Sequence, residues 1–306
     1  MELRHLRYFV AVAEESHITR AAEKLGIQQP PLSQQIKALE TELDVQLFRR
    51  KPRGVELTDA GRLLLEDARQ ILEKVEHARA ATQRTARGEQ GRIVAGFTSS
   101  APFHPLVPRV IRSFREATPL VSMQLEEAGT GTLVEGLRNE TLDVAFIRSP
   151  VSDVEGIAVH PLIEEDMVVA LHAGHRIAAE GDEEPIALEA LASEPFILYR
   201  RSVGPGLHDA IITACNGAGF TPDVAQEAPR ITSTLNLVAA GLGVSLVPDS
   251  LRRLQMDGIS YRCIRQRPAL KAPLNLACRR VENSIAVRRF IDMTRLAAAA
   301  FPVETV

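Results

Sequence analysis

Apolar residues near the start of the chain recur at helical spacing in three successive segments. They occur within residues 3–15, then at Ala21, Ala22 and Leu25, and then at Leu32, Ile36 and Leu39. The last three stand at i, i+4 and i+7, so the segment has one apolar face. The pattern predicts three short helices that share one small core.

The residues between the second and third segments are typical of a helix end followed by a helix start. Gly26 can take the positive φ that ends a helix, and Pro30 and Pro31 fit a first turn, where an N–H has no helical partner. The face of the third helix opposite the apolar one is polar. Such side chains can bond to base edges, and a lysine can neutralise a phosphate. We predict a helix-turn-helix with DNA contacts from Gln29, Pro30, Ser33, Gln34 and Lys37. A helical hairpin with a solvated polar face is the alternative.

A basic run follows, with four cations in the five positions 49–53 and with Pro52 and Gly54 inside or beside it. Pro and Gly in such a run, flanked by a short alternating segment, predict a two-stranded wing. We expect Arg50 and Arg53 to contact phosphates or a minor groove. A solvated basic loop is the alternative.

A long helix is predicted at residues 59–87, capped by Thr58 and tolerating Gly61 near its start. Its small and apolar residues follow steps of 4 and 3, which is the a/d pattern of a helix that needs a partner helix. These residues are Leu64, Ala68, Ile71, Val75, Ala78, Thr82 and Thr85. We therefore expect a dimer in preference to packing on the same chain. Residues 88–91 would form a hinge.

Beyond the hinge, short apolar runs alternate with helical patterns. Strands are expected at residues 92–97, 122–126, 142–147, 167–172, 196–199, 245–247 and 274–278, and helices at 106–117, 133–139, 207–216, 233–241 and 285–299. This order predicts a mainly parallel sheet with helices on both faces. The fold class is therefore α/β overall, with an all-α head at residues 1–58. We expect two lobes, residues 92–161 with 266–306 and residues 162–265.

Ligands in such folds bind beyond the carboxyl ends of strands or at helix N-termini. Several polar residues stand at such places, where hydroxyls and helix N–H groups beside a guanidinium would suit a carboxylate. The candidates are Ser99, Ser100, Thr130, Arg148, Arg201, Ser202 and Thr232. The alternative is that the Ser and Thr residues only cap helices and the arginines are surface residues.

Composition narrows the class of protein. Apolar residues make up 45% and the net charge is -3, with 15 Lys+Arg and 13 Asp+Glu in residues 1–88, so the head is slightly basic. Cys215, Cys263 and Cys278 lack metal or disulfide spacing, and we expect buried thiols. We find no catalytic constellation, no metal site and no cofactor motif. A signal peptide and a membrane-spanning helix are also not expected, and this favours the cytoplasm.

The stretch LRHLRYFVAVAEESHITRAAEKLGIQQPPLSQQIKALETELDVQLFRR and then RGVELTDAGR closely resembles the N-terminal domain of LysR-type transcriptional regulators. AGT at 128–130, DVAFIR at 143–148 and LVAAGLGVSLVP at 237–248 resemble the family's effector domain. The QPPLS form is most similar to the subgroup that acts on aromatic-acid and catechol degradation operons.

This resemblance implies a winged helix-turn-helix, a two-lobed effector domain of the periplasmic-binding-protein type and a dimer of dimers. It also implies a small inducer, often an aromatic or muconate-like carboxylate, and activation of transcription together with RNA polymerase. Many members carry arginine where this chain has Gln34, and the sequence alone does not tell how this changes the base preference. Two rival functions are an enzyme carrying a DNA-binding head and an exported solute-binding protein.

Overall fold

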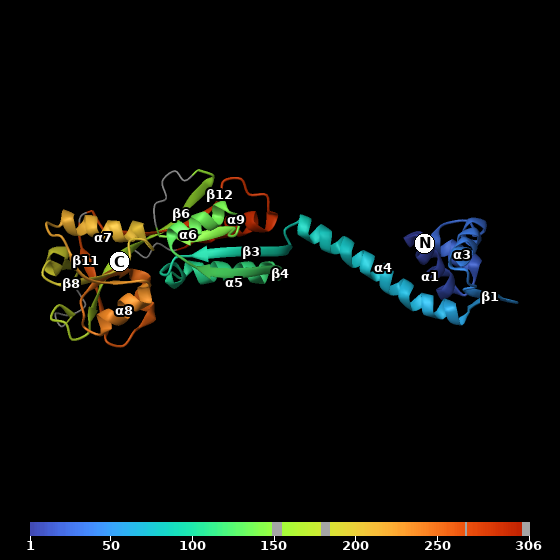
Figure 1. The fold of residues 1–306 in the computed structure, drawn as a ribbon, viewed down its shortest axis with the longest axis horizontal. Helices are drawn as coiled ribbons and strands as arrows, with labels where there is room; N and C mark the ends of the chain where they lie inside the picture. Colours follow the sequence, from blue (N-terminus) through green and yellow to red (C-terminus); the bar gives the residue numbers. More distant parts are fainter. Residues whose placement is uncertain (149–154, 179–183, 267, 302–306) are drawn as a thin grey trace. The chain divides into compact units, whose positions relative to one another are not determined.

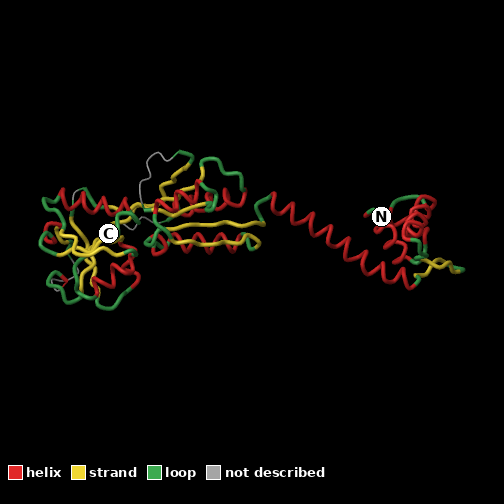
Figure 2. The backbone as a smooth tube through the Cα atoms, in the orientation of Figure 1, coloured by secondary structure: helices red, strands yellow, loops and turns green. Residues whose placement is uncertain are grey.

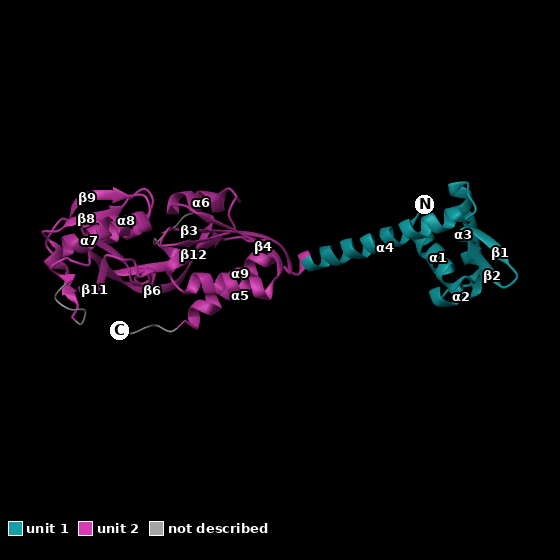
Figure 3. Ribbon diagram, turned by 90° about the horizontal axis from the view of Figure 1, so that it is seen from below, with its two compact units in different colours: residues 1–84 teal, residues 85–306 magenta. Residues whose placement is uncertain are grey.

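The computed structural model describes residues 1–148, 155–178, 184–266 and 268–301. Contacts divide the chain into two compact units, Met1–Arg84 and Thr85–Val306, which Figure 3 colours separately. We refer to them as the head and the effector unit and describe each by itself.

The head contains three short helices, a two-stranded hairpin and the start of a long helix (Figure 1). In chain order these are α1 (Leu3–Glu15), α2 (Ile18–Leu25), α3 (Gln29–Leu43), β1 (Phe48–Lys51), β2 (Gly54–Leu57) and α4 (Asp59–Ala86). One apolar core joins them, with Phe9, Leu32 and Leu39 fully buried. The apolar spacing therefore predicted both the helices and their inward faces.

The start of α4 is fixed more tightly than its sequence indicated. The hydroxyl of Thr58 accepts a hydrogen bond from the Gly61 amide at 3.0 Å, as expected of a cap. Gly61 is not merely tolerated, because a Cβ there would lie 2.2 Å from the Leu47 carbonyl oxygen. This glycine lets α4 pack directly on the chain that enters β1.

The predicted partner-facing seam of α4 is corrected at its first two positions. Ala68 is buried in the core of the head and Leu64 is partly buried against that core, so both pack on this chain. Ile71 is exposed, and so is Leu63, which the predicted seam did not include. The first turns of α4 therefore pack on the head itself, which was the alternative we had set aside.

The effector unit is built on an eight-stranded sheet of order β4-β3-β5-β12-β6-β11-β7, with β10 also paired to β6. The bounds are β3 (Gln90–Phe97), β4 (Leu120–Glu127), β5 (Val144–Ile147), β6 (Ile157–His172), β7 (Ile186–Ala187), β10 (Ser245–Pro248), β11 (Ile259–Arg265) and β12 (Lys271–Arg279). A separate parallel pair is formed by β8 (Pro195–Tyr199) and β9 (Asp223–Ala228). The long strand β6 runs through both halves of the unit.

Helices cover this framework around two main cores (Figure 2). They are α5 (Leu106–Ala117), α6 (Thr130–Arg138), α7 (Pro205–Gly217), α8 (Ile231–Ala239) and α9 (Ile285–Ala299), with short 3-10 turns at Ala101–Phe103, Leu188–Leu191 and Asp249–Leu254. One core lies under α5 and α9, where the rings of Phe114 and Phe290 pack edge to face with their centroids 5.2 Å apart. The other lies under α7 and α8. A smaller cluster lies under α6.

The expected mainly parallel sheet was wrong in part. The pairs of β3 with β4 and with β5 are parallel, but β12 runs antiparallel to β5 and β6, and β10 and β11 run antiparallel to β6. The strands that connect the two halves of the effector unit run back along the sheet, and they therefore lie antiparallel to their neighbours. We also did not predict β7, β9 and β11, because β7 is only two residues long and β9 and β11 are not the short apolar runs by which the other strands of this unit were identified.

Two of the three thiols are buried, as expected, while Cys263 is only partly so. Burial raises the pKa of the Cys215 thiol to about 11, so it stays protonated near neutral pH. Among the described residues, no helix has the length and apolar character needed to cross a membrane.

Candidate functional sites

The turn between α2 and α3 has the geometry that its sequence predicted. Gly26 has φ +68° and ends α2, while the Ile27 amide donates to the Ala22 carbonyl at 3.0 Å. Pro30 and Pro31 lie in the first turn of α3, where they cost no helical hydrogen bond. The turn is thereby short enough for α2 and α3 to share one core.

The predicted DNA contacts on α3 lie on its outer side. Leu32, Ile36 and Leu39 are buried, whereas Gln29, Pro30, Gln34 and Lys37 are exposed and Ser33 is half-buried. The Gln29 side-chain amide donates to the Ser33 hydroxyl at 2.7 Å, which orders both groups before any ligand arrives. Within the described parts of the chain, Lys37 has no ion pair, so its charge is available to a phosphate.

The wing carries the basic run. The strands β1 and β2 pair with Lys51 opposite Gly54, which leaves Pro52 and Arg53 at the tip. Lys51 forms an ion pair with Glu56, whereas Arg50 and Arg53 have no ion pair among the residues that the structure describes. Arg50 and Arg53, which we predicted to contact DNA, are thus available to an anionic partner. Arg49 is the third such cation of the wing.

Residues that sequence reasoning missed attach the wing to the helices. Glu40 of α3 accepts hydrogen bonds from the Leu47 and Phe48 amides at 2.7 and 3.1 Å. The Val55 amide donates to the Ser16 carbonyl at 2.9 Å, and a Cβ on Gly54 would lie 2.3 Å from that oxygen. The polar face of α3 and the basic wing are therefore held in one unit.

In the effector unit a small pocket of about 30 Å³ gathers residues from distant segments. It is lined by the predicted residues Ser99, Ser100, Thr130 and Arg148, and also by Thr98, Tyr199, Val203, Gly204, Gly206, Leu207 and Ile231. Thr130 and Ile231 are the first residues of α6 and α8, and Gly206 lies in the first turn of α7. Helix N-termini carry partial positive charge and free N–H groups, so three of them at one pocket favour an anion.

Three buried polar atoms around this pocket have no hydrogen-bond partner among the described residues. They are Thr98 Oγ1, Arg148 Nε and the Tyr199 hydroxyl. Burying such groups without a partner costs free energy, which makes them candidates for binding a ligand. Burial raises the pKa of Tyr199, so its hydroxyl remains a donor.

Arg148 is already neutralised by the protein. It is 3% exposed, and its Nη1 lies 2.5 Å from Glu165 Oε1 on β6. Glu165 also accepts hydrogen bonds from the Ser250 amide at 2.7 Å and the Ser250 hydroxyl at 3.2 Å. Burial lowers the pKa of Arg148, and Glu165 opposes this by favouring the charged form. An anion in the pocket would therefore meet neutral donors rather than an uncompensated cation.

The other three predicted effector contacts do not line this pocket. Arg201 is exposed and donates two hydrogen bonds to Asp209 of α7, at 2.7 and 2.8 Å. Ser202 is exposed, and Thr232 lies one residue beyond Ile231 on α8 without lining the pocket. Arg201 and Ser202 follow the predicted strand β8, and Thr232 lies in the first turn of α8. Tyr199 and Glu165 were missed, because one ends an apolar strand and the other lies in a run of acidic residues.

A larger groove of about 780 Å³ runs between α5 and β4 and contains none of the predicted residues. Its lining is mostly apolar, with Arg112, Arg115 and Glu116 among the polar members. Metal chemistry has no support in the described parts of the chain, where no group of three or more His, Cys, Asp or Glu residues could hold an ion.

Comparison with known proteins assigns both units. Residues 3–62 match the family described as "Bacterial regulatory helix-turn-helix protein, lysR family", and residues 86–299 match "LysR substrate binding domain". The chain belongs to the LysR family. This family consists of ligand-responsive DNA-binding transcriptional regulators and not of enzymes.

Individual relatives cover almost the whole chain. The HTH-type transcriptional regulator BudR of Raoultella terrigena is 39% identical, over 96% of this chain and 100% of its own length. A probable cat1 operon transcriptional activator of Acinetobacter lwoffii is 37% identical over 86% of each chain. The crystal structure of full-length CbnR complexed with target DNA has a TM-score of 0.85, with 31% identity, 97% of this chain and 100% of that chain covered. The LysR fold of this chain is thus shared with a protein solved on DNA.

Proposed function

We propose that this LysR-family chain activates an operon for the breakdown of a small carboxylate, and that a carboxylate from that route is its inducer. The observation that carries the proposal is the pocket at which the N-termini of α6, α7 and α8 meet the hydroxyls of Ser99, Ser100 and Thr130. Donors of this kind suit the two oxygens of a carboxylate.

The compensated charge of Arg148 shapes the expected selectivity. Because Glu165 neutralises the guanidinium, affinity for an anion would rest on hydroxyls, the Tyr199 donor and the helix ends. The pocket, at about 30 Å³, is small, so an inducer of the size of an aromatic acid has to part its walls to enter. Such a change would alter the relative orientation of the two lobes and, through it, DNA binding.

For the head, we propose that Gln29, Ser33 and Gln34 read base edges with Pro30 beside them, and that Lys37, Arg50 and Arg53 hold the backbone or a minor groove. Their exposure and the absence of ion pairs at the three cations, among the described residues, support this. The name of the cat1 relative, an operon transcriptional activator, supports the role of an activator for this chain. As an activator, this chain would act with RNA polymerase on promoter DNA in the cytoplasm.

We further propose a homodimer through α4 that assembles as a dimer of dimers. Leu63 is 65% exposed and Ile71 is 38% exposed, and apolar side chains of this size on one helix favour a partner. Two heads would then address half-sites whose centres are about 10 bp apart, or a multiple of that spacing.

Thermal unfolding of the full chain with a panel of aromatic and muconate-type carboxylates, each beside its primary amide, tests the inducer class. We expect stabilisation by a carboxylate and not by its amide, about 2.7 kcal/mol at 100 times Kd. Thr130→Val should remove the stabilisation, and Thr232→Val, outside the pocket, should keep it. Equal stabilisation by acid and amide, or none by any carboxylate, would contradict the proposal.

A further inference from the structure

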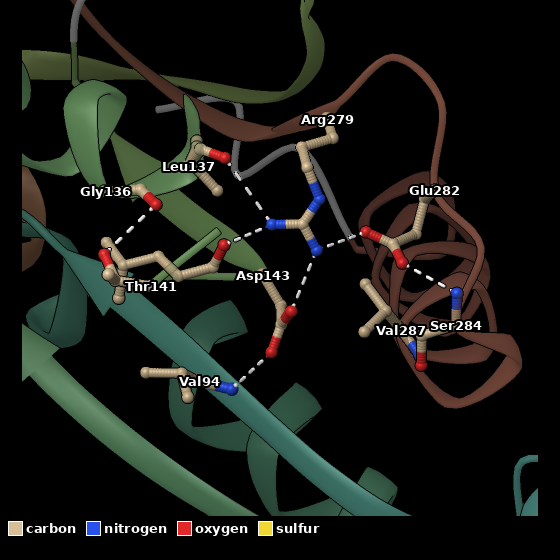
Figure 4. Close-up of polar contacts among 10 residues, drawn as sticks. Val94, Gly136, Leu137, Thr141, Asp143, Arg279, Glu282, Ser284 and Val287 are labelled. Atoms are coloured by element: carbon tan, nitrogen blue, oxygen red, sulfur yellow. Dashed lines mark hydrogen bonds and ion pairs between the residues drawn. The ribbon is translucent and has the colours of Figure 1, made fainter. Parts of the chain in front are cut away.

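Arg279, the last residue of β12, is the centre of a partly buried polar network distinct from the pocket (Figure 4). Its guanidinium donates to the Leu142 carbonyl at 2.6 Å, the Leu137 carbonyl at 3.5 Å, Asp143 at 2.9 Å and Glu282 at 2.6 Å. The Arg279 and Glu282 side chains are 18% and 8% exposed. Charge-assisted bonds in such surroundings are among the stronger ones in a protein.

One side of the network holds the C-terminal end of α6. Leu137 is in the last turn of α6, and Leu142 and Asp143 follow it. Asp143 also accepts a hydrogen bond from the Val94 amide of β3 at 2.8 Å, so Arg279 joins α6 to the central sheet. Because α6 begins at Thr130 in the pocket, one short helix connects the pocket with Arg279.

The other side of the network holds the N-terminal end of α9. Glu282 accepts a hydrogen bond from the Ser284 amide at 2.7 Å, and the Ser284 hydroxyl caps α9 by accepting from the Val287 amide at 3.4 Å (Figure 4). The ion pair of Arg279 and Glu282 therefore fixes where α9 starts.

The residues that follow α4 rest on this same end of α9. Gly88 is buried with φ +66°, and a Cβ there would lie 2.8 Å from both the Ala286 amide nitrogen and Ile285 Cγ2. The Arg87 carbonyl accepts a hydrogen bond from Arg289 at 3.5 Å. Gly88, the first residue of the predicted hinge, is thus in contact with the part of α9 that Arg279 and Glu282 hold.

We propose that Arg279 is a positioning residue that couples the pocket to the hinge through α6 and the start of α9. The proposal rests on the pocket being the inducer site, as proposed above. Movement of the first turn of α6 shifts its last turn, and Arg279 transmits the shift through Glu282 to the residues against which Gly88 packs. Each element in this route is in direct contact with the next, from Thr130 to Gly88.

A methyl group added at the pocket end of α6, which we call the wedge, tests this coupling without an inducer. Gly129 has an ordinary φ of -71°, and a Cβ there would lie 3.0 Å from the Val203 carbonyl oxygen, so Gly129→Ala presses α6 away from the opposite wall. Gly131 is two residues further on with nothing within 4 Å of an added Cβ, so Gly131→Ala is the matched control.

Hydrogen–deuterium exchange of the full chain is the readout. We expect Gly129→Ala to speed amide exchange at residues 85–91 and 284–290 by about fivefold, the lower end of usual coupling between sites. Gly131→Ala should leave both segments unchanged. In an Arg279→Met background the wedge should add nothing at these segments, and exchange in β11, which contributes no residue to the pocket, should stay unchanged throughout.

Two outcomes would overturn the coupling. One is a wedge effect confined to residues near 129, and the other is an equal wedge effect with and without Arg279. Glu282→Gln serves as a second background if Arg279→Met does not fold, because it removes the ion pair and keeps an acceptor for the Ser284 amide. Since no inducer is used, failure here leaves the carboxylate proposal to its own thermal unfolding test.

Discussion

The polar face of the head and the pocket of the effector unit are the two places that we propose for DNA and inducer, and they obtain their polar groups differently. The predicted DNA contacts fall between residues 29 and 53, on one helix and one hairpin, and all but Ser33 are exposed. The pocket draws on residues from Thr98 to Ile231, and Ser100, Thr130 and Arg148 are buried. One surface presents free side chains to solvent, and the other keeps them in a preformed arrangement inside the protein.

This difference in exposure determines whether a charged side chain on the wing or at the pocket can bind an external partner. Arg53 on the wing keeps an uncompensated charge because water screens it, whereas Arg148 at the pocket is stable only with Glu165 beside it. An exposed cation can therefore serve an external partner directly, but a buried one is first a structural element. Substitutions of buried charges should therefore cost far more stability than substitutions of exposed ones.

Glu165→Gln should be the most destabilising change, because it leaves the Arg148 charge buried without a counter-charge. We expect a loss of about 3–5 kcal/mol in the free energy of unfolding of the effector unit. Denaturant titration of the full chain measures it. The control is a double variant in which both Glu165 and Arg148 are replaced by Met, which removes both charges and keeps side chains of similar size. It should restore much of the lost free energy of unfolding. A cost below about 1 kcal/mol, as at exposed pairs, would show that the Arg148 charge is compensated elsewhere.

Gln29→Ala and Arg53→Ala should affect DNA binding in different ways. We expect the first to change discrimination at one base pair by about 1–3 kcal/mol. The second should weaken binding to all sequences and lower the slope of log affinity against log salt by about 0.9. Titrations on the DNA adjoining the gene for this chain, at several salt concentrations, measure both.

Lys51→Ala is the matched control on the wing, because its side chain is already paired with Glu56. Its effect on the salt slope should be smaller than that of Arg53→Ala. An equal effect would mean that the ion pair of Lys51 with Glu56 breaks when the head binds DNA. If no wing variant changed the salt slope, the wing would not be part of the DNA interface.

Asp209→Asn should have the smallest effect. Arg201 and then His208 hold the pKa of Asp209 at about 2, below its ordinary value, so the carboxylate stabilises the folded state at neutral pH. The pair is exposed, and we expect a loss below about 1 kcal/mol at pH 7. The difference from the unsubstituted chain should shrink as the pH falls from about 5 to 2. Thermal unfolding over this range checks it, and a difference that grows on acidification would contradict the assigned pair.

Much of the head was predictable because its signals are local. The spacing of Leu32, Ile36 and Leu39, with Gly26 before them, located α3 and its outward face correctly. In the effector unit the same reasoning located α5 and α9 and the core of most strands. It failed for strand direction at β12, because pairing across the sheet depends on residues far away in the chain.

The sequence by itself determined the LysR family resemblance, the helices and most strands, and which face of α3 is polar and exposed. These depend on periodicity and on residues close together in the chain. Only the tertiary structure decided that Leu64 and Ala68 pack inside the head, that Glu165 neutralises Arg148, and that Arg279 joins α6 to α9. Burial makes such pairings energetically important, and burial results from the packing of segments that are distant in the chain.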